Sequence, residues 1–377
     1  MKNMLGATAL ALCAAMLTSC AGPEPPADVA LKDAVGDAFT IGVAVNGEQM
    51  AGRDSLGVAI VKKHFNSLVG ENCMKCMFIH PEEDCYDFAG ADSLVAFAQA
   101  NNMELIGHCL VWHSQYAPWF YVDSTGAEVK GDVLWQRIKD HITTIVSRYK
   151  GKIKGWDVCN EIIEGDGNLR DSPLTRQLGS EFIYKSLQLV HELDPDAEIY
   201  LNDYGMTNPG RRAGYMALID TIRARGIRLD AFGLQGHMGM DFPDSAAVEQ
   251  TLKDFEAKGM PVMITEWDMG ALPTLTQSAN VTIEDERPVA DDENNIYRDG
   301  LPDSVSVAWN ARMRMFWDIF LAHKANIKRV TIWGVTDKDT WKNDFPVLGR
   351  TDYPLVFDRQ GQMKPFMKQY INEVTKK

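Results

Sequence analysis

The chain has 377 residues, of which 45% are hydrophobic and 24% charged, and its formal net charge at pH 7 is −14. This composition is typical of a globular protein with a sizeable core. The excess of acidic residues argues against nucleic acid as a partner, because phosphates are bound by surplus Lys and Arg. A neutral or weakly charged substrate fits better.

The N-terminus has the features of a secretory signal. Lys2 supplies a positive charge, and an apolar run follows from Leu5 to Leu17. The run ends in Leu17-Thr18-Ser19-Cys20, which resembles the lipobox of bacterial lipoproteins, in which the Cys is lipidated. We therefore predict a lipoprotein signal peptide over residues 1–19, lipidation of Cys20, and a lipid anchor in a bacterial membrane, preferably the outer membrane, on its periplasmic or cell-surface side. An ordinary cleaved signal with an incidental Cys is the alternative.

Five cysteines remain beyond the leader, an odd number that prevents all of them from pairing within one chain. Cys73 and Cys76 have C-x-x-C spacing, but no second ligand pair stands at the spacing that a zinc site requires, so no metal site is expected. A disulfide among Cys73, Cys76, Cys85 and Cys109 and a set of buried free thiols are both open.

After a predicted flexible tether over residues 20–36, short β-branched runs alternate with longer amphipathic stretches. This alternation is typical of repeated βα units around a parallel sheet. The predicted strands are Phe39–Val45, Ser67–Glu71, Glu104–Val111, Ile153–Cys159, Glu198–Asn202, Ala231–Gln235, Val262–Glu266 and Arg329–Trp333. Helical patterns with apolar residues at three and four spacing include Leu134–Tyr149, Phe182–Leu193, Ala213–Arg225, Ala246–Ala257, Ser306–Ala322 and Pro365–Val374.

These units predict an α/β fold, a closed (β/α)8 TIM barrel in a single catalytic domain over residues 37–377. An open doubly wound sheet usually stops sooner and carries a Gly-rich phosphate loop after its first strand, and the sequence has no such loop there. A long acidic segment at about residues 270–303 is predicted to be a loop between strand seven and helix seven. On the C-terminal face of the barrel, it would rim the active-site cleft.

Polar and aromatic residues gather where the predicted strands end. In barrels of this kind, the catalytic groups sit at the C-terminal ends of the strands and converge on one cleft. The clusters are Glu71-Asn72, His108, Trp112-His113, Asn160-Glu161, Asn202-Asp203-Tyr204, Gln235-Gly236-His237, Glu266-Trp267-Asp268 and Trp333. Since they follow nearly every predicted strand, we interpret them as one site rather than as chance loop residues.

Glu161 and Glu266 stand directly at strand ends and are the candidate catalytic pair. Hydrolysis of a glycosidic bond needs one protonated carboxyl group, which gives a proton to the leaving oxygen, and one ionised carboxylate on the other face of the sugar. A nucleophilic mechanism requires roughly 5 to 5.5 Å between the carboxyl groups, against about 6.5 to 9.5 Å when a water must fit between them.

Aromatic rings and amides complete the predicted site, because flat rings can pack against pyranose faces while amides bind hydroxyl groups. They are Trp112, Tyr204, Trp333 and Trp341 among the aromatic residues and Asn72, Asn160 and Gln235 among the amides. His108 and His237 have no carboxylate at metal-ligand spacing, so we expect them to hydrogen bond to hydroxyl groups or to a catalytic carboxylate.

Six blocks, in order along the chain, resemble the signature blocks of family ten glycoside hydrolases, the endo-β-1,4-xylanases. They are Gly107-His108-Cys109-Leu110-Val111-Trp112-His113-Ser114-Gln115, Trp156-Asp157-Val158-Cys159-Asn160-Glu161, Leu201-Asn202-Asp203-Tyr204, Gly233-Leu234-Gln235-Gly236-His237, Ile264-Thr265-Glu266-Trp267-Asp268 and Trp333-Gly334-Val335-Thr336-Asp337-Lys338-Asp339-Thr340-Trp341. The resemblance runs from about Phe39 to the C-terminus. Six ordered blocks are far more specific than any single motif.

The resemblance implies the roles of the catalytic residues. Glu161 matches the acid/base and Glu266 the nucleophile of an enzyme that hydrolyses β-1,4-xylan with retention, through a covalent glycosyl-enzyme. His237 matches a His that bonds the nucleophile, and Asp268 matches the Asp that holds this His. Such bonds would lower the pKa of Glu266, while desolvation would raise that of Glu161.

The resemblance also implies a set of residues that bind xylan and xylo-oligosaccharides. Glu71, Asn72 and Lys75 match a group that grips the xylose on the non-reducing side of the cut. The other matching residues are His108, Trp112, Gln115, Asn160, Tyr204, Gln235, Trp333 and Trp341. We expect no cofactor and no metal, and a chain that acts as a monomer.

Three positions depart from the family pattern. Cys76 stands where Trp is usual, Gly205 where Asn is frequent, and Trp267 where Leu is common. Because none of them is a catalytic glutamate, they put the affinity of outer subsites and the length of the products in doubt rather than the activity.

Two other functions compete with this interpretation. A β-1,4-glycanase acting on glucan or mannan could share the architecture and both glutamates, but the remaining blocks oppose it. A lipid-anchored sugar-binding protein that has lost catalysis could share the aromatic residues. The two glutamates, together with His237 and Asp268, oppose that second function.

Overall fold

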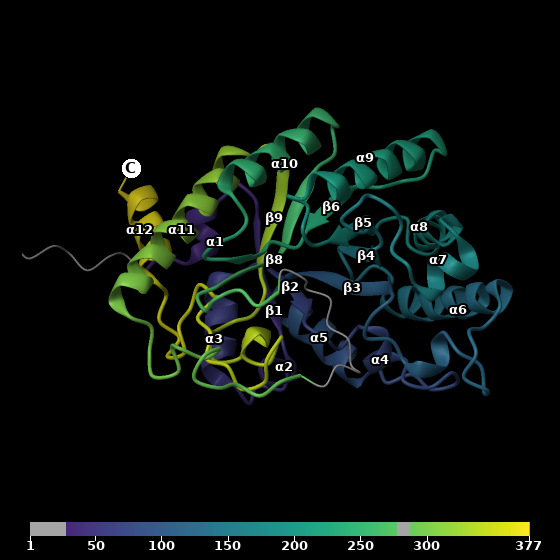
Figure 1. Cartoon of the computed structure of the whole chain (residues 1–377), viewed down its shortest axis with the longest axis horizontal. Helices are drawn as coiled ribbons and strands as arrows, with labels where there is room; N and C mark the ends of the chain where they lie inside the picture. Colours follow the sequence, from purple (N-terminus) through teal and green to yellow (C-terminus); the bar gives the residue numbers. More distant parts are fainter. Residues whose placement is uncertain (1–27, 277–286, 377) are drawn as a thin grey trace, which may run out of the picture.

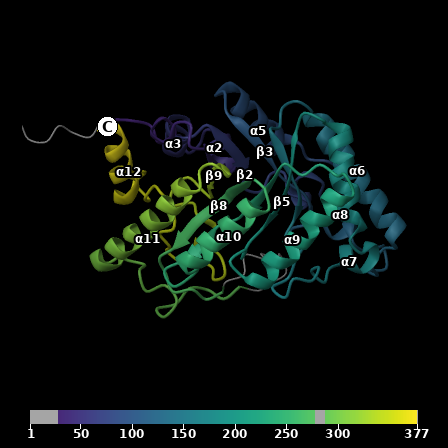
Figure 2. The same ribbon diagram turned by 90° about the horizontal axis from the view of Figure 1, so that it is seen from above.

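The computed structural model describes residues 28–276 and 287–376. At its centre is a closed ring of eight parallel strands surrounded by helices (Figures 1 and 2). The ring strands are β1 (Thr40–Val45), β2 (Ser67–Gly70), β3 (Glu104–Trp112), β4 (Gly155–Asn160), β5 (Glu198–Asp203), β6 (Ala231–Leu234), β8 (Val262–Gly270) and β9 (Ile327–Ile332). The ring closes where β1 pairs with β9 and β6 pairs with β8. The predicted (β/α)8 barrel is confirmed.

A short additional strand, β7 (His237–Gly239), pairs with the second half of β8. This pairing explains why β8 continues to Gly270, past its predicted end at Glu266. In this register, His237 lies opposite Asp268. The extra strand therefore places an imidazole beside a carboxylate at the rim of the ring.

Helices cover the outside of the ring, with α6 to α8 on one side and α11 and α12 on the other (Figure 1). The helices are α1 (Leu31–Val35), α2 (Gly47–Met50), α3 (Ser55–His64), α4 (Cys76–Ile79), α5 (Ala89–Ala100), α6 (Gly131–Tyr149), α7 (Pro173–Leu178), α8 (Glu181–Leu193), α9 (Pro209–Ala224), α10 (Ser245–Ala257), α11 (Asp303–Ala322) and α12 (Pro365–Thr375). Two 3₁₀ turns, Pro118–Phe120 and Trp341–Asn343, stand in the loops.

The strands are apolar along nearly their whole length because both of their faces are buried. Inside the ring, side chains fill the space as in other barrels of this type. They are Ala44, Val69, Ile106, Tyr200, Ala231, Met263 and Trp333. Outside it, helices such as α6 bury Leu134, Ile138 and Ile142 at four-residue spacing. Since the interior is filled, a substrate can reach the strands only at an end of the ring.

The predicted tether, residues 20–36, is wrong at its C-terminal end. Leu31 and Val35 of α1 are 0% and 5% exposed and pack in the core beside α3 and α12. The backbone N–H of Leu31 also lies 3.1 Å from His64 Nδ1. Two apolar residues four positions apart are too short a pattern to predict a helix. The predicted signal peptide and Cys20 lie outside the described residues.

The five cysteines of the described chain, Cys73, Cys76, Cys85, Cys109 and Cys159, are all free thiols, so the disulfide alternative is wrong. Within residues 28–276 and 287–376, no group of three or more His, Cys, Asp or Glu could hold a metal ion. None of the helices in these same ranges combines the length and apolar character needed to cross a membrane.

Candidate active site

The C-terminal ends of the ring strands open onto one cleft of about 830 Å³. It is lined by Glu71, Asn72, Lys75, His108, Trp112, Gln115, Asn160, Glu161, Gln235, His237, Glu266, Arg287, Trp333, Trp341, Asp344 and Phe345. The strand register brings distant residues together, since Trp112 pairs with Asn160 and Asn160 pairs with Asn202. Of the predicted site residues, all line the cleft except Tyr204 and Asp268, which adjoin it, and Cys20.

Glu161 follows β4, where the chain leaves the strand with a positive φ of 56°. Its carboxyl group accepts hydrogen bonds from Gln235 Nε2 (2.9 Å) and Trp112 Nε1 (3.0 Å). Burial raises the pKa of this carboxyl group; Gln235 lowers it, and the charge of Glu266 raises it again, so that it lies above its ordinary value. The protonated form is favoured, as a general acid requires.

Glu266 projects from β8 into the same cleft. Its Oε1 atom accepts a hydrogen bond from Asn202 Nδ2 (2.8 Å), and its Oε2 atom lies 3.2 Å from His237 Nε2. Burial acts to raise the pKa of Glu266, but the hydrogen bond from His237 and the charges of the two nearby histidines outweigh it and hold the pKa below its ordinary value. One cleft therefore holds two carboxyl groups with opposite shifts, which is how acid and base roles are separated.

His237 connects Glu266 to a second, fully buried carboxylate. Its Nδ1 atom lies 3.0 Å from Asp268 Oδ2, which also accepts a hydrogen bond from Trp341 Nε1 (2.7 Å). Burial opposes the charged imidazolium, but Asp268 and Glu266 raise the pKa of His237 to about 9. Lys342 Nζ, 3.3 Å from Asp268 Oδ1, helps to keep Asp268 ionised. The imidazolium thus stays charged beside Glu266 at neutral pH.

One wall of the cleft is built around Lys75. Its Nζ atom donates to Gln115 Oε1 (2.7 Å) and Asn72 Oδ1 (3.0 Å) and lies 5.3 Å from the ring centroid of Trp112. Burial lowers the pKa of Lys75. Two of the three ammonium protons of Lys75 bind these amides, which leaves one that can bind a sugar hydroxyl group.

The base of the cleft is formed where His108 meets Trp333. The two rings are 5.4 Å apart in an edge-to-face arrangement. His108 Nδ1 lies 2.9 Å from Asp157 Oδ2 on β4, and both side chains are 3% exposed. The carboxylate therefore fixes the orientation of the imidazole that faces the cleft.

Sequence reasoning includes Asn202 among the strand-end clusters but assigns no role to it or to Asp157, although both lie within recognised blocks. Asn202 stands two residues after Tyr200, whose ring fills the barrel interior, so the two share the inward face of β5. A polar residue at an inward position of a buried strand was the available signal. Asn202 donates to Glu266 and lies 2.9 Å from the side-chain amide of Asn160, which makes it a support for the nucleophile.

Tyr204 lies beside the cleft rather than in it. It lines an adjoining, mainly apolar pocket of about 770 Å³ that shares Gln235 and His237 with the cleft. Its hydroxyl oxygen accepts a hydrogen bond from Arg170 NH2 (3.1 Å). The predicted aromatic contact with a sugar would therefore occur in this adjoining pocket, beside Gln235 and His237.

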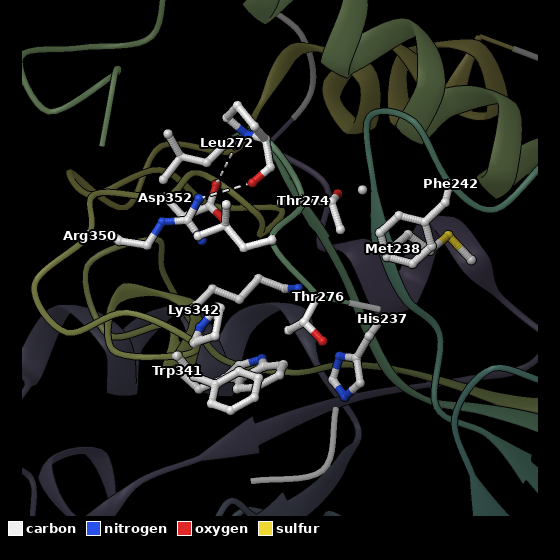
Figure 3. A pocket seen from close by; sticks show the side chains of 16 residues that line it. His237, Met238, Phe242, Leu272, Thr274, Thr276, Trp341, Lys342, Arg350 and Asp352 are labelled. Atoms are coloured by element: carbon white, nitrogen blue, oxygen red, sulfur yellow. Dashed lines mark hydrogen bonds between the residues drawn. The ribbon is translucent and has the colours of Figure 1, made fainter. Parts of the chain in front are cut away.

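A second adjoining pocket, of about 490 Å³, separates His237 and Trp341 from the start of the long loop after β8 (Figure 3). In Figure 3, the Lys342 side chain extends above the Trp341 ring toward the loop residue Thr276. Asp352 accepts hydrogen bonds from the backbone of Ala271 and Leu272 in this loop. Arg287, the first residue described after position 276 of this loop, lines the cleft itself.

Comparisons with known proteins point to one family. The model of "Glycosyl hydrolase family 10" matches residues 30–373. An endo-1,4-beta-xylanase A of Xylanibacter ruminicola is 42% identical over 341 residues, which cover 90% of this chain and 92% of that protein. A beta-1,4-xylanase of Dictyoglomus thermophilum is 35% identical over 336 residues, which cover 89% of this chain and 88% of the relative.

Solved structures agree with these relatives. A family 10 endoxylanase retrieved from a sugarcane soil metagenome superposes with a TM-score of 0.85 at 33% identity, covering 92% of this chain and 99% of that one. A xylanase from Paenibacillus barcinonensis, solved in complex with a conduramine derivative, has a TM-score of 0.79 at 31% identity, covering 93% and 99%.

Proposed function

The chain belongs to glycosyl hydrolase family 10, and from this membership we propose that it is an endo-β-1,4-xylanase that cleaves the xylan backbone with retention of configuration. The observation that carries the proposal is the pair of oppositely shifted glutamates in one cleft. The relatives named above are xylanases, which supports xylan over other β-1,4-glycans.

Family membership implies a double displacement, and the opposite pKa shifts of the two glutamates support it. Glu161, with its raised pKa, donates its proton to the leaving oxygen while the ionised Glu266 attacks the anomeric carbon and forms a glycosyl ester. Glu161, now ionised, then takes a proton from water, which attacks the same carbon and releases Glu266. Asn202 and His237 fix the orientation of the nucleophile throughout.

The remaining residues of the cleft would bind the substrate. We assign Glu71, Asn72 and Lys75 to the xylose on the non-reducing side, next to the ring of Trp112. Hydroxyl groups suit this wall, because its donors and acceptors are amides, one lysine and the carboxyl group of Glu71. The other proposed sugar contacts are His108, Gln115, Asn160, Tyr204, Gln235, Trp333 and Trp341.

The test is release of reducing ends from xylan, carboxymethylcellulose and mannan by the wild-type chain and by Glu266→Ala. We expect activity on xylan, little on the other two polymers, and a loss on the order of 10⁴-fold or more in the variant, which should still bind xylo-oligosaccharides. An inactive wild-type chain that binds sugars would favour the sugar-binding alternative. Greater activity on glucan or mannan would favour the other glycanases.

We also propose that residues 1–19 are a lipoprotein signal peptide and that Cys20 carries the lipid anchor. Support comes from the charge of Lys2, the apolar run from Leu5 to Leu17 and the small residues before Cys20. We expect the lipid on Cys20 to insert into the outer membrane of the bacterium that produces the chain. In cells labelled with an alkyne fatty acid, the wild-type chain should take up label and Cys20→Ser should not; label in the variant would contradict the proposal.

A further inference from the structure

Glu161 stands at the base of a small hairpin, residues 161–170, called here the Glu161 hairpin. Ile163 and Leu169 form an antiparallel bridge, and Gly167 makes the turn with a φ of 88°. The backbone N–H of Arg170 donates to Ile162 O (2.9 Å). The hairpin therefore returns the chain to its starting point and brings Arg170 next to Glu161.

The guanidinium group of Arg170 joins three partners and is 8% exposed. Its Nε atom donates to the backbone carbonyl oxygen of Glu161 (2.7 Å), and NH2 donates to the hydroxyl oxygen of Tyr204 (3.1 Å). NH1 lies 2.8 Å from Glu164 Oε1. Only the planar fork of an arginine can serve three such directions at once.

The outer side of the Glu161 hairpin is already fixed by close packing on α9. A Cβ atom at Gly210 would come within 2.3 Å of Gly165 O, and one at Gly214 within 2.4 Å of Gly167 O. These glycines let the two backbones touch. Arg170 contacts the hairpin at a different point, the backbone carbonyl oxygen of Glu161 at its start.

Glu161 needs such support, because its positive φ is unfavourable for a residue with a side chain. Its carboxyl group is bonded by Trp112 of β3 and by Gln235, which follows β6, while its backbone carbonyl is bonded by Arg170. The same guanidinium group donates to the hydroxyl oxygen of Tyr204, an aromatic residue of the adjoining pocket that we propose as a sugar contact. One side chain thus links the backbone of the acid/base to a proposed sugar contact.

We propose that Arg170 is a positioning residue for proton transfer: by binding the carbonyl of Glu161 and the hydroxyl of Tyr204, it aligns the Glu161 carboxyl group with the leaving oxygen. This inference rests on the proposed function. Its distinctive consequence is that Arg170 matters only when the leaving group needs a proton. A role limited to holding the fold would affect every substrate equally.

The test compares kcat/KM for xylotetraose, whose leaving sugar must be protonated, with kcat/KM for 2,4-dinitrophenyl β-xylobioside, whose phenolate leaves without help. Arg170→Met and Arg170→Lys should lose about 10- to 100-fold on xylotetraose, part of the roughly 10²- to 10⁴-fold that general acid catalysis contributes. On the dinitrophenyl substrate, both should stay within about threefold of wild type, because attack by Glu266 is unchanged. Lysine should not restore activity, since it keeps the charge but loses the fork.

Arg176→Met serves as the matched control, because Arg176 is 44% exposed and pairs with Glu128 and Asp171 at the surface; it should lose nothing on either substrate. Should Arg170→Met fold poorly in a thermal melt, Arg170→Lys decides. Equal losses on the two substrates, or no loss on xylotetraose, would overturn the inference in an enzyme that is otherwise active. Failure of the proposed function would instead be seen in the wild-type chain, as absence of xylan hydrolysis.

Discussion

The two candidate catalytic glutamates are buried to nearly the same depth, at 2% and 5% exposed, yet their pKa values move in opposite directions. The carboxyl group of Glu161 accepts hydrogen bonds from the neutral side chains of Trp112 and Gln235, so the effect of burial dominates and its pKa is raised. Glu266 faces the imidazolium of His237, which is kept charged by Asp268. Neighbouring charge rather than depth therefore separates the acid from the nucleophile.

Asp268→Asn tests this chain of charges. An amide at this position leaves His237 without its anionic partner, so the pKa of His237 falls and that of Glu266 rises. Since Glu266 must be ionised to attack, the acidic limb of the kcat/KM profile should move to higher pH. We also expect kcat/KM at the optimum pH to fall on the order of 10- to 100-fold. Each tenfold corresponds to about 1.4 kcal/mol of lost transition-state stabilisation.

The measurement is a pH–rate profile of xylo-oligosaccharide hydrolysis, with Asp132→Asn at the exposed start of α6 as the control. The control variant should have the wild-type kcat/KM and the wild-type position of the acidic limb. An acidic limb that stays in place in Asp268→Asn would show that Asp268 acts on orientation alone.

At the scale of elements, sequence patterns predict the ring strands well and their ends less well. Short runs of β-branched residues, which alternate along the chain with helical patterns, identify all eight ring strands, because each strand is buried on both faces. The continuation of β8 to Gly270 depends on β7, whose three residues carry no periodic signal. The start of the long loop is likewise held by Asp352, which accepts hydrogen bonds from Ala271 and Leu272 from far along the chain.

Helix α1 is the clearest correction at this scale, and Leu31→Ala tests it. Leu31 is 0% exposed and packs beside α3 and α12, so its truncation should lower the free energy of unfolding by about 2 to 5 kcal/mol. Asp33→Ala, on the exposed side of the same helix, should stay within about 0.5 kcal/mol of wild type. Urea titration measures the free energy of unfolding of both variants. Equal, small effects would mean that residues 31–35 are a tether rather than a packed helix.

At the scale of the whole molecule, the fold and the main site residues follow from sequence because βα repetition fixes a closed ring and the ring gathers strand ends at one face. The supporting network does not follow in the same way. Asp157, Asn202 and Arg170 act through contacts between strands and loops 9 to 64 residues apart. Such contacts depend on register and rotamer, which no local pattern records.

The same network makes global stability depend on pH. The pKa of His237 is raised to about 9 in the folded chain, against about 6.5 when unfolded. Its contribution is therefore fully present below pH 6.5 and is lost as the pH rises through 9. The pKa values of Asp203 and Asp337 are raised from 3.8 to about 7 and about 6, so their contributions are also lost as the pH rises, but over a range that lies below that of His237.

Between pH 7 and 9, wild type should therefore lose up to about 1.4 kcal/mol of unfolding free energy per pH unit more than His237→Gln, the amount that one proton contributes. Denaturant titrations at steps of half a pH unit measure how the unfolding free energy of each protein changes with pH. The slopes are compared rather than the absolute free energies, because the variant also loses two hydrogen bonds. His191→Gln, at an exposed position of α8, should keep the wild-type slope. Parallel slopes for wild type and His237→Gln would mean that the imidazole is neutral in the folded enzyme, and Glu266 would then need another source for its low pKa.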